Sequence, residues 1–190
     1  MPLVLAGATS GSTTIQATDA VTQTITLPNN TGTVLTTAST FGGTGPAFFA
    51  FANAGTLQSI SDSTWTKVTL GGELFDTNSN FASSRFTPTV AGYYQINASA
   101  SNNWTTTGPK ITQVAIYKNG SVYVSNGMDA TYWGITPQLY NGGQLISSIV
   151  YLNGSTDYVE MYVRVVGATL PSITQGQDIT NFSGAMIRSA

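Results

Sequence analysis

The carboxylates are the residues of this 190-residue chain whose chemistry could serve catalysis. The sequence contains no histidine and no cysteine, so the usual general base, the commonest transition-metal ligand and the best nucleophile are absent. Glycoside hydrolysis needs only two carboxylates, and the chain has Asp19, Asp62, Glu73, Asp76, Asp129, Asp157, Glu160 and Asp178. No two of them form a tight motif, and most stand beside turn residues, where aspartate caps or bends the backbone. The sequence therefore predicts a protein that is not an enzyme and needs no cofactor.

Aromatic residues in loop-like stretches are the second group that could act on a ligand. Trp104 stands beside the segment 105–109, and Tyr132 and Trp133 stand beside Gly134. Exposed aromatics in the loops of a rigid scaffold can stack on sugars or on other proteins. The alternative is that these side chains anchor their loops on the core.

The composition excludes several classes of partner. Charged residues make up 7% of the chain, against ~25% in an average soluble domain. The net charge is −2 and no Lys/Arg cluster is present, which argues against nucleic-acid binding. No stretch approaches the ~18 apolar residues that span a membrane, and Met1–Ala8 lacks the features of a signal peptide. A chain so poor in charge suits a protein packed against others, although a β-protein with a Thr/Ser-rich surface would look the same.

The first 40 residues are dominated by Thr, Ala, Gly and Ser, which is not a composition that forms a core. Alternating residues 21–27 and the run 33–36 predict two strands joined by a five-residue turn. An isolated two-stranded ribbon is marginally stable, so this arm needs a partner surface; a flexible leader is the alternative. We expect docking through the apolar residues Leu3, Val4, Leu5, Ile15, Val21, Ile25 and Leu27.

A boundary follows the arm, because three glycines and one proline lie within residues 39–46. We therefore divide the chain into an arm at 1–40, a linker at 41–46 and a domain at 47–190. The domain shows short apolar or alternating runs separated by turn residues, and no window has a convincing helical period. This pattern predicts an all-β antiparallel sandwich, most simply a jelly roll. Within it, the segment 84–96 predicts two strands with a corner at Gly92.

Five motifs in the domain occur in a consistent order. They are Pro46–Phe51, the pair Lys67-Val68 with Phe75–Asn78, the set Phe86, Pro88, Gly92, Tyr93 and Tyr94, then Lys118-Asn119-Gly120, and last Phe182-Ser183-Gly184. In these motifs the region from Pro46 to Ile187 resembles the globular head of the C1q and tumour-necrosis-factor-like family. One departure is Asp157, which is displaced from the Gly-Asp pair that the family usually carries. The resemblance implies a jelly-roll homotrimer in which one face of the inner sheet points at a threefold axis.

One strand offers a candidate for the trimer interface. Val159, Met161, Val163 and Val165 would pack inside the sandwich, which leaves the other face to Tyr158, Glu160, Tyr162 and Arg164. Two tyrosines between opposite charges predict a subunit interface. The alternative is a half-exposed strand with a cross-strand salt bridge. Tyr94 is assigned to the interface as well, as a residue of the core or of the axis.

Calcium is the only metal that the sequence suggests. Oxygen ligands are plentiful, and the resemblance adds that some C1q-like heads carry calcium near the apex. The candidates are Asp129 and Asp157, although no loop has the acidic density of an EF-hand.

The N-terminal arm is the part of the chain from which we predict where the head acts. No collagen-like stalk precedes the head, and the arm resembles the Thr-rich ribbons of phage structural proteins. The resulting prediction is a trimeric capsid decoration (cement) protein in the virion, assembled in the host cytoplasm, whose arm docks on the major capsid protein or another virion protein. The alternative is a fibre tip or head fibre that recognises a host surface glycan through Trp104, Tyr132 and Trp133. A secreted ligand would need an export signal, which we do not find.

Overall fold

The computed structural model describes residues 3–6, 12–15, 45–53, 55, 57–104, 111–129 and 142–190. The chain divides into the units Met1–Phe41 and Gly42–Ala190. In the first unit, β1 (Leu3–Ala6) pairs antiparallel with β2 (Ser12–Ile15), with Leu3 opposite Ile15. The ribbon predicted at residues 21–36 lies outside the described residues.

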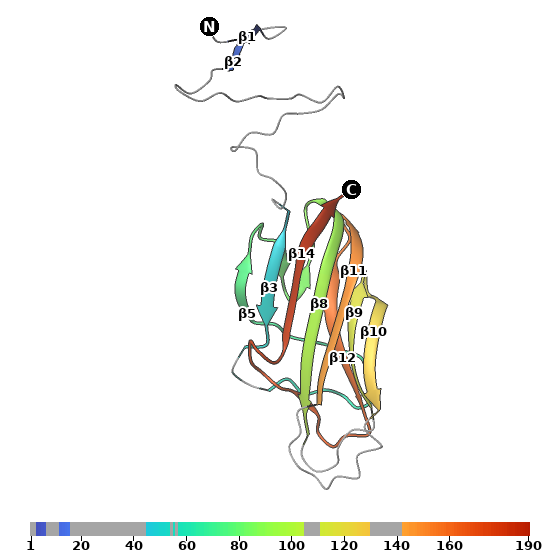
Figure 1. Cartoon of the computed structure of the whole chain (residues 1–190). Coiled ribbons are helices and arrows are strands. Elements are labelled where there is room, and N and C mark those ends of the chain that lie inside the picture. The colour runs from blue at the N-terminus through green and yellow to red at the C-terminus, as the bar shows by residue number, and fades with distance from the viewer. Residues whose placement is uncertain are drawn as a thin grey trace. The chain divides into compact units, whose positions relative to one another are not determined.

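The second unit contains two antiparallel six-stranded sheets (Figure 1). The first, named here the β8 sheet, has the order β11-β8-β14-β3-β5, with β13 paired to β8. Its strands are β3 (Ala47–Phe51), β5 (Gly72–Asp76), β8 (Ala91–Asn103), β11 (Gly142–Asn153), β13 (Ser172–Ile173) and β14 (Asn181–Ser189).

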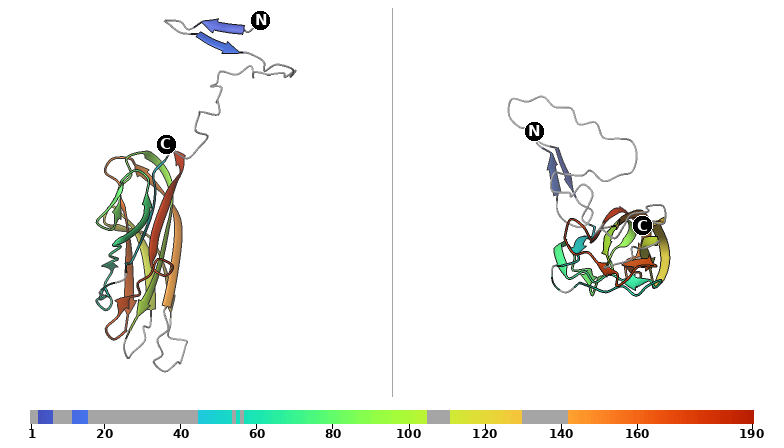
Figure 2. Two further views of the ribbon diagram at one scale, coloured as in Figure 1. Left: turned by 90° about the vertical axis from the view of Figure 1, so that its left-hand side faces the viewer. Right: turned by 90° about the horizontal axis from the view of Figure 1, so that it is seen from below.

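The second sheet, named the β12 sheet, has the order β10-β9-β12-β7-β6, with β4 paired to β12. Its strands are β4 (Thr66–Lys67), β6 (Phe81–Ala82), β7 (Arg85–Phe86), β9 (Ile111–Lys118), β10 (Ser121–Asp129) and β12 (Val159–Val166). The side view in Figure 2 shows that the long strands of the unit lie along one common axis. The predicted antiparallel β-sandwich is confirmed. None of the described segments forms a helix long and apolar enough to cross a bilayer.

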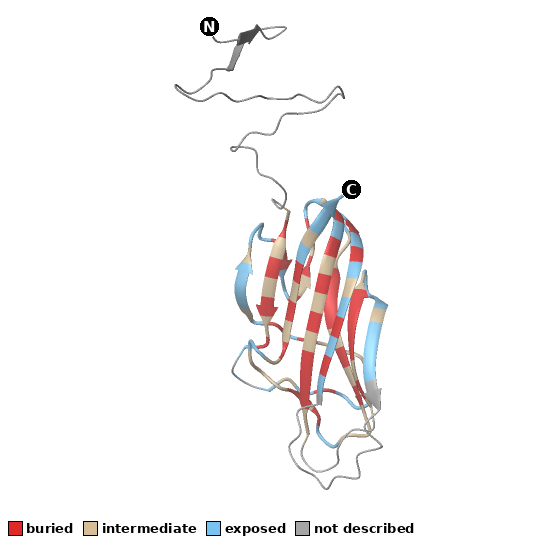
Figure 3. Ribbon diagram, viewed as in Figure 1, coloured by how far each residue is buried: buried red, intermediate tan, exposed pale blue. Residues whose placement is uncertain are grey.

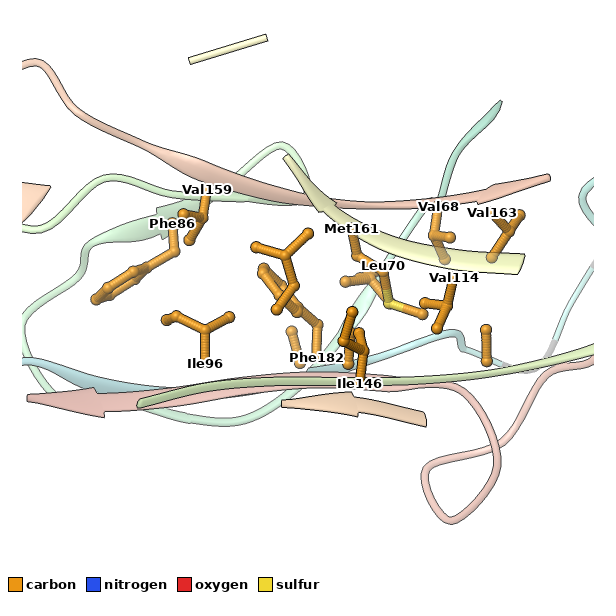
Figure 4. Close-up of a cluster of buried hydrophobic side chains, with 14 of the residues drawn as sticks. Val68, Leu70, Phe86, Ile96, Val114, Ile146, Val159, Met161, Val163 and Phe182 are labelled. Atoms are coloured by element: carbon orange, nitrogen blue, oxygen red, sulfur yellow. The ribbon is translucent and has the colours of Figure 1, made fainter. Parts of the chain in front are cut away.

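The core lies between the two sheets because their strands alternate inward and outward residues. In β8 the inward positions Tyr94, Ile96, Ala98 and Ala100 are fully buried, and the residues between them are not (Figure 3). Figure 4 shows the two layers meeting, with Ile96, Ile146 and Phe182 facing side chains of the β12 sheet such as Val159, Met161 and Val163. Phe48 is stacked on Phe86 at 4.3 Å between ring centroids.

Gly92 lies inside β8 and not at the predicted corner between two strands. A glycine is required at this position for another reason. It pairs with Ser189 of β14, just beyond a bulge in that strand between Met186 and Arg188. A Cβ added at Gly92 would lie 2.5 Å from the carbonyl oxygen of Arg188. Close approach of two backbones therefore explains this glycine.

Side chains close the sandwich where the edge strands β10 and β11 run side by side. The carbonyl oxygens of Ile149 and Leu145 in β11 accept hydrogen bonds from Tyr123 Oη at 3.1 Å and Asn126 Nδ2 at 2.9 Å. Lys118 Nζ donates to the carbonyl oxygen of Tyr151 at 2.7 Å. Edge carbonyls that would otherwise be open to strand addition are thus satisfied within the chain.

Candidate functional site

The outward face of β12 carries a cluster of charged and aromatic side chains that are paired within the chain. The predicted alternation is confirmed, because Val159, Met161, Val163 and Val165 are fully buried. On the opposite face, Glu160 is only 2% exposed. One of its carboxylate oxygens, Oε1, accepts from Lys67 Nζ at 2.7 Å and from Arg85 Nε at 2.8 Å.

The neighbours of Glu160 complete this cluster. The Arg85 guanidinium lies 3.8 Å from the centroid of the Tyr158 ring, and Tyr162 is stacked on Tyr117 at 3.9 Å. Arg164 Nε donates to the carbonyl oxygen of Ser63 at 3.1 Å. Burial alone would raise the pKa of Glu160, but the hydrogen bonds from Lys67 and Arg85 outweigh it, and the net pKa is lowered. The arrangement matches the cross-strand salt bridge that was the alternative to an interface, and whether Tyr158 or Tyr162 also touches a second subunit remains a prediction.

The assignment of Tyr94 to the interface is wrong. Its side chain is fully buried between the sheets, where it lies edge-on to Phe86 at 5.6 Å, and its hydroxyl donates to the carbonyl oxygen of Val90 at 2.6 Å. Burial raises the pKa of Tyr94 to about 12. Tyr94 is a core residue with no surface to offer a partner.

The outward face of the β8 sheet presents the apolar surface that β12 lacks. At one end, Tyr93 and Tyr151 lie opposite each other on β8 and β11, with ring centroids 5.4 Å apart. Beside this pair, Tyr93 lines a hollow of about 500 Å³ together with Ile149 of β11 and Ile187 of β14. All four of these side chains are between 42% and 53% exposed. Exposed aromatic and branched aliphatic groups gathered on one face mark an interaction surface.

A polar strip and further apolar residues complete this face. Next to the hollow, Ser147 Oγ accepts from Gln95 Nε2 at 2.6 Å and donates to Asn97 Oδ1 at 2.7 Å. Beyond the strip Leu145 is 64% exposed, and Phe75 of β5 lies beside Phe49 of β3 with ring centroids 6.3 Å apart. We call the set Phe49, Phe75, Tyr93, Leu145, Ile149, Tyr151 and Ile187 the β8 face. Because its polar groups bond to one another, the face can be covered without leaving them unsatisfied.

The residues of β11 contain a sequence signal for the β8 face. In β11 the inward residues Ile146, Val150 and Leu152 are buried, and the outward residues that precede each of them, Leu145, Ile149 and Tyr151, are exposed and apolar. A strand that is apolar on both faces is typical of burial on both sides.

The predicted calcium ligands are not brought together. Asp157 Oδ1 accepts from Asn119 Nδ2 at 2.7 Å, and Oδ2 accepts from Lys118 Nζ at 2.9 Å. These bonds, the Asn119 one foremost, lower the pKa of Asp157. N–H donors thus face both carboxylate oxygens, where a calcium ion would need them free. Asp129 is the last residue of β10, and its side chain lies outside the described set. Among the described residues, no three acidic side chains lie close enough together to hold a metal ion.

The remaining predicted site residues are only partly described. Trp104 is half-buried, with its backbone N–H donating to Asn103 Oδ1 at 2.8 Å, whereas Tyr132 and Trp133 lie outside the described residues. Of the predicted docking residues, Leu3, Val4 and Leu5 lie in β1 and Ile15 lies in β2. Val21, Ile25 and Leu27 lie outside the described residues.

Comparison with known proteins finds likeness in structure only. No protein-family model matches the sequence, and no curated protein is similar to it. Among solved structures, murine APRIL at pH 5.0 superposes with a TM-score of 0.54 at 9% identity, over 75% of this chain and 99% of that one. Eiger TNF from S. frugiperda superposes with a TM-score of 0.58 at 9% identity, over 77% of this chain and 95% of that one. The head of this chain therefore has the jelly-roll fold of the tumour-necrosis-factor and C1q-like proteins.

Proposed function

We propose that this protein is a non-enzymatic structural component of a phage virion, in which three heads associate through the β8 face and the N-terminal arms dock on the particle. The observation that carries the proposal is the β8 face itself. It presents seven large apolar side chains, while the outward face of β12 is paired within the chain.

The β8 face suits association between copies of one chain. Aromatic residues are enriched and charges depleted at the centres of interfaces, and among the described residues that line the hollow beside Tyr93 only Arg188 has a charged side chain. A cyclic arrangement closes such contacts without leaving an open surface that would build fibres. The number three follows from the resemblance to the C1q and tumour-necrosis-factor heads.

The virion role rests on the arm. Its described strands β1 and β2 have four residues each, and so small a ribbon needs a partner for stability. Three arms on one trimer would bind together, so weak contacts with a capsid protein or another virion protein would combine through effective concentration. Only 7% of the residues are charged, which agrees with a protein that remains packed against other proteins.

Deletion of residues 1–41 tests the docking role. We expect the shortened protein to remain a folded trimer and to lose binding to virus particles, because the head forms a unit of its own from Gly42. Co-sedimentation with particles stripped of the native protein measures this binding, with the full-length chain as the control. If the shortened trimer still decorates particles, the arm is not the docking element.

The number of copies on each particle distinguishes the two virion roles. Hundreds of copies agree with decoration of the capsid, whereas a few dozen or fewer indicate a fibre that meets the host surface. Cryo-electron microscopy of intact particles gives this count directly.

A further inference from the structure

A polar cleft lies beside the hairpin of β6 and β7, on the β12 sheet. Its volume is about 510 Å³. The residues that line it include Lys67, Arg85, Ser79, Ser83, Thr87 and Thr89. It belongs to neither the β8 face nor the arm, so the proposed function gives it no role.

The cleft carries one positive charge that Glu160 does not neutralise. Lys67 and Arg85 both bind the same oxygen of Glu160, and these three side chains together have a net charge of +1. The side chains of Lys67 and Arg85 remain 31% and 43% exposed. Arg85 uses Nε for Glu160 and rests on the Tyr158 ring, which leaves its terminal N–H groups for a ligand. The two cations are therefore held in place before any ligand arrives.

Hydroxyl groups form much of the remaining wall. Ser79, Ser83 and Thr87 make no side-chain hydrogen bond to another residue within the described parts of the chain, and Ser79 and Ser83 are exposed. Ser79 has a φ of 53° and Ser83 a φ of 52°, both in the left-handed region that serine rarely occupies. Ser83 and Ser84, with φ values of 52° and 56°, are the two residues of the turn that joins β6 to β7, and a two-residue hairpin turn of this type has positive φ at both positions. Ser84 Oγ accepts a hydrogen bond from the backbone N–H of Leu70 at 2.8 Å, whereas Ser83 lines the cleft.

We propose that this cleft binds an acidic sugar, that is, a pyranose that carries one carboxylate and several hydroxyls. The carboxylate would bridge Lys67 and the terminal N–H groups of Arg85, since one surplus positive charge matches a monoanion better than a phosphate of nearly two charges. The ring hydroxyls would exchange hydrogen bonds with Ser79, Ser83 and Thr87. None of the described residues that line the cleft is aromatic, so binding rests on charge and hydrogen bonds rather than on stacking.

Titration of the full-length protein with D-glucuronic acid, followed by NMR, tests the proposal. We expect saturable binding of glucuronic acid and none of D-glucose, which differs only by the carboxylate. Ser83→Asp places a negative charge at the rim, at a backbone conformation that aspartate tolerates, and should weaken binding about tenfold. The matched control is Ser125→Asp, which adds the same charge at an exposed position of β10 away from the cleft and should leave binding unchanged.

Three results would overturn the proposal. Equal binding of glucose and glucuronic acid would remove the role of the cations. Inorganic phosphate binding as tightly as glucuronic acid would show a general anion site rather than a sugar site. Equal effects of Ser83→Asp and Ser125→Asp would place the ligand elsewhere.

Discussion

Glu160 is the residue that joins the elements of the β12 sheet through a single carboxylate. Lys67 lies 93 positions before it and Arg85 lies 75 positions before it, yet both bind the same oxygen. A buried carboxylate is costly unless it is paired, so the two cations are what allow Glu160 to be 2% exposed. The ion pairs thus fix β4 and β7 to β12.

The lowered pKa of Glu160 links this cluster to the pH dependence of stability. In the folded state the carboxyl gives up its proton at a lower pH than its ordinary value of 4.5, which applies to the unfolded chain. The ion pairs therefore stabilise the fold above pH 4.5, and that contribution is lost as the pH falls through the lowered pKa.

Glu160→Gln should lower the free energy of unfolding at pH 7 by about 1–3 kcal/mol, because two partly exposed cations lose their anion. The difference from the wild type should shrink at an acidic pH well below 4.5, because the wild-type carboxyl takes up its proton as the pH falls through the lowered pKa. Urea denaturation at the two pH values measures both effects. Glu73→Gln, at an exposed position of β5, is the control and should change little. A difference that stays constant with pH would show that Glu160 acts through packing alone.

At the scale of elements, β8 and β14 depend on the close approach of their backbones at Gly92. A methyl group there would lie 2.5 Å from a carbonyl oxygen of β14, a contact that side-chain rotation cannot relieve. Gly143 of β11 has nothing within 4 Å of the corresponding position. The two glycines therefore form a matched pair within one sheet.

Gly92→Ala should destabilise the head by about 1–3 kcal/mol, as overpacking does elsewhere. Gly143→Ala should leave stability unchanged or raise it slightly, since alanine restricts the unfolded chain more than glycine does. Denaturant unfolding of the two variants beside the wild type makes the comparison. If the two variants were equally stable, the prediction would be contradicted, because β14 would then be able to move away from residue 92 at its bulge without loss of stability.

The elements were largely predictable because they depend on local patterns. The alternation from Tyr158 to Val165 gave both faces of β12 correctly, and the turn residues predicted an all-β sandwich. The partners of those faces were not predictable, since Lys67 and Arg85 reach Glu160 from distant parts of the chain. Tyr94 was misassigned for the same reason: nothing in its neighbours shows that its hydroxyl finds a carbonyl oxygen inside the sandwich. We therefore propose the interface on the β8 sheet rather than on β12.

At the scale of the whole head, the two outer surfaces have opposite characters. The β12 sheet bears the paired charges around Glu160, whereas the β8 sheet bears the apolar residues around Tyr93 and Ile149. Where β10 runs beside β11, edge carbonyls of β11 are occupied by side chains, which disfavours growth by strand addition there. Association through the β8 face is consistent with all three features.

The mass of the protein in solution, measured by light scattering during gel filtration, tests this account most directly. We predict about three times the 19.9 kDa of one chain for the wild type. Ile149→Asp should reduce the mass to that of one chain, because association would bury the new charge within the β8 face. Val122→Asp, at a residue that is 46% exposed on β10 against 51% for Ile149, should remain trimeric. A wild type that is monomeric, or an Ile149→Asp variant that is still trimeric, would contradict the assignment of the β8 face.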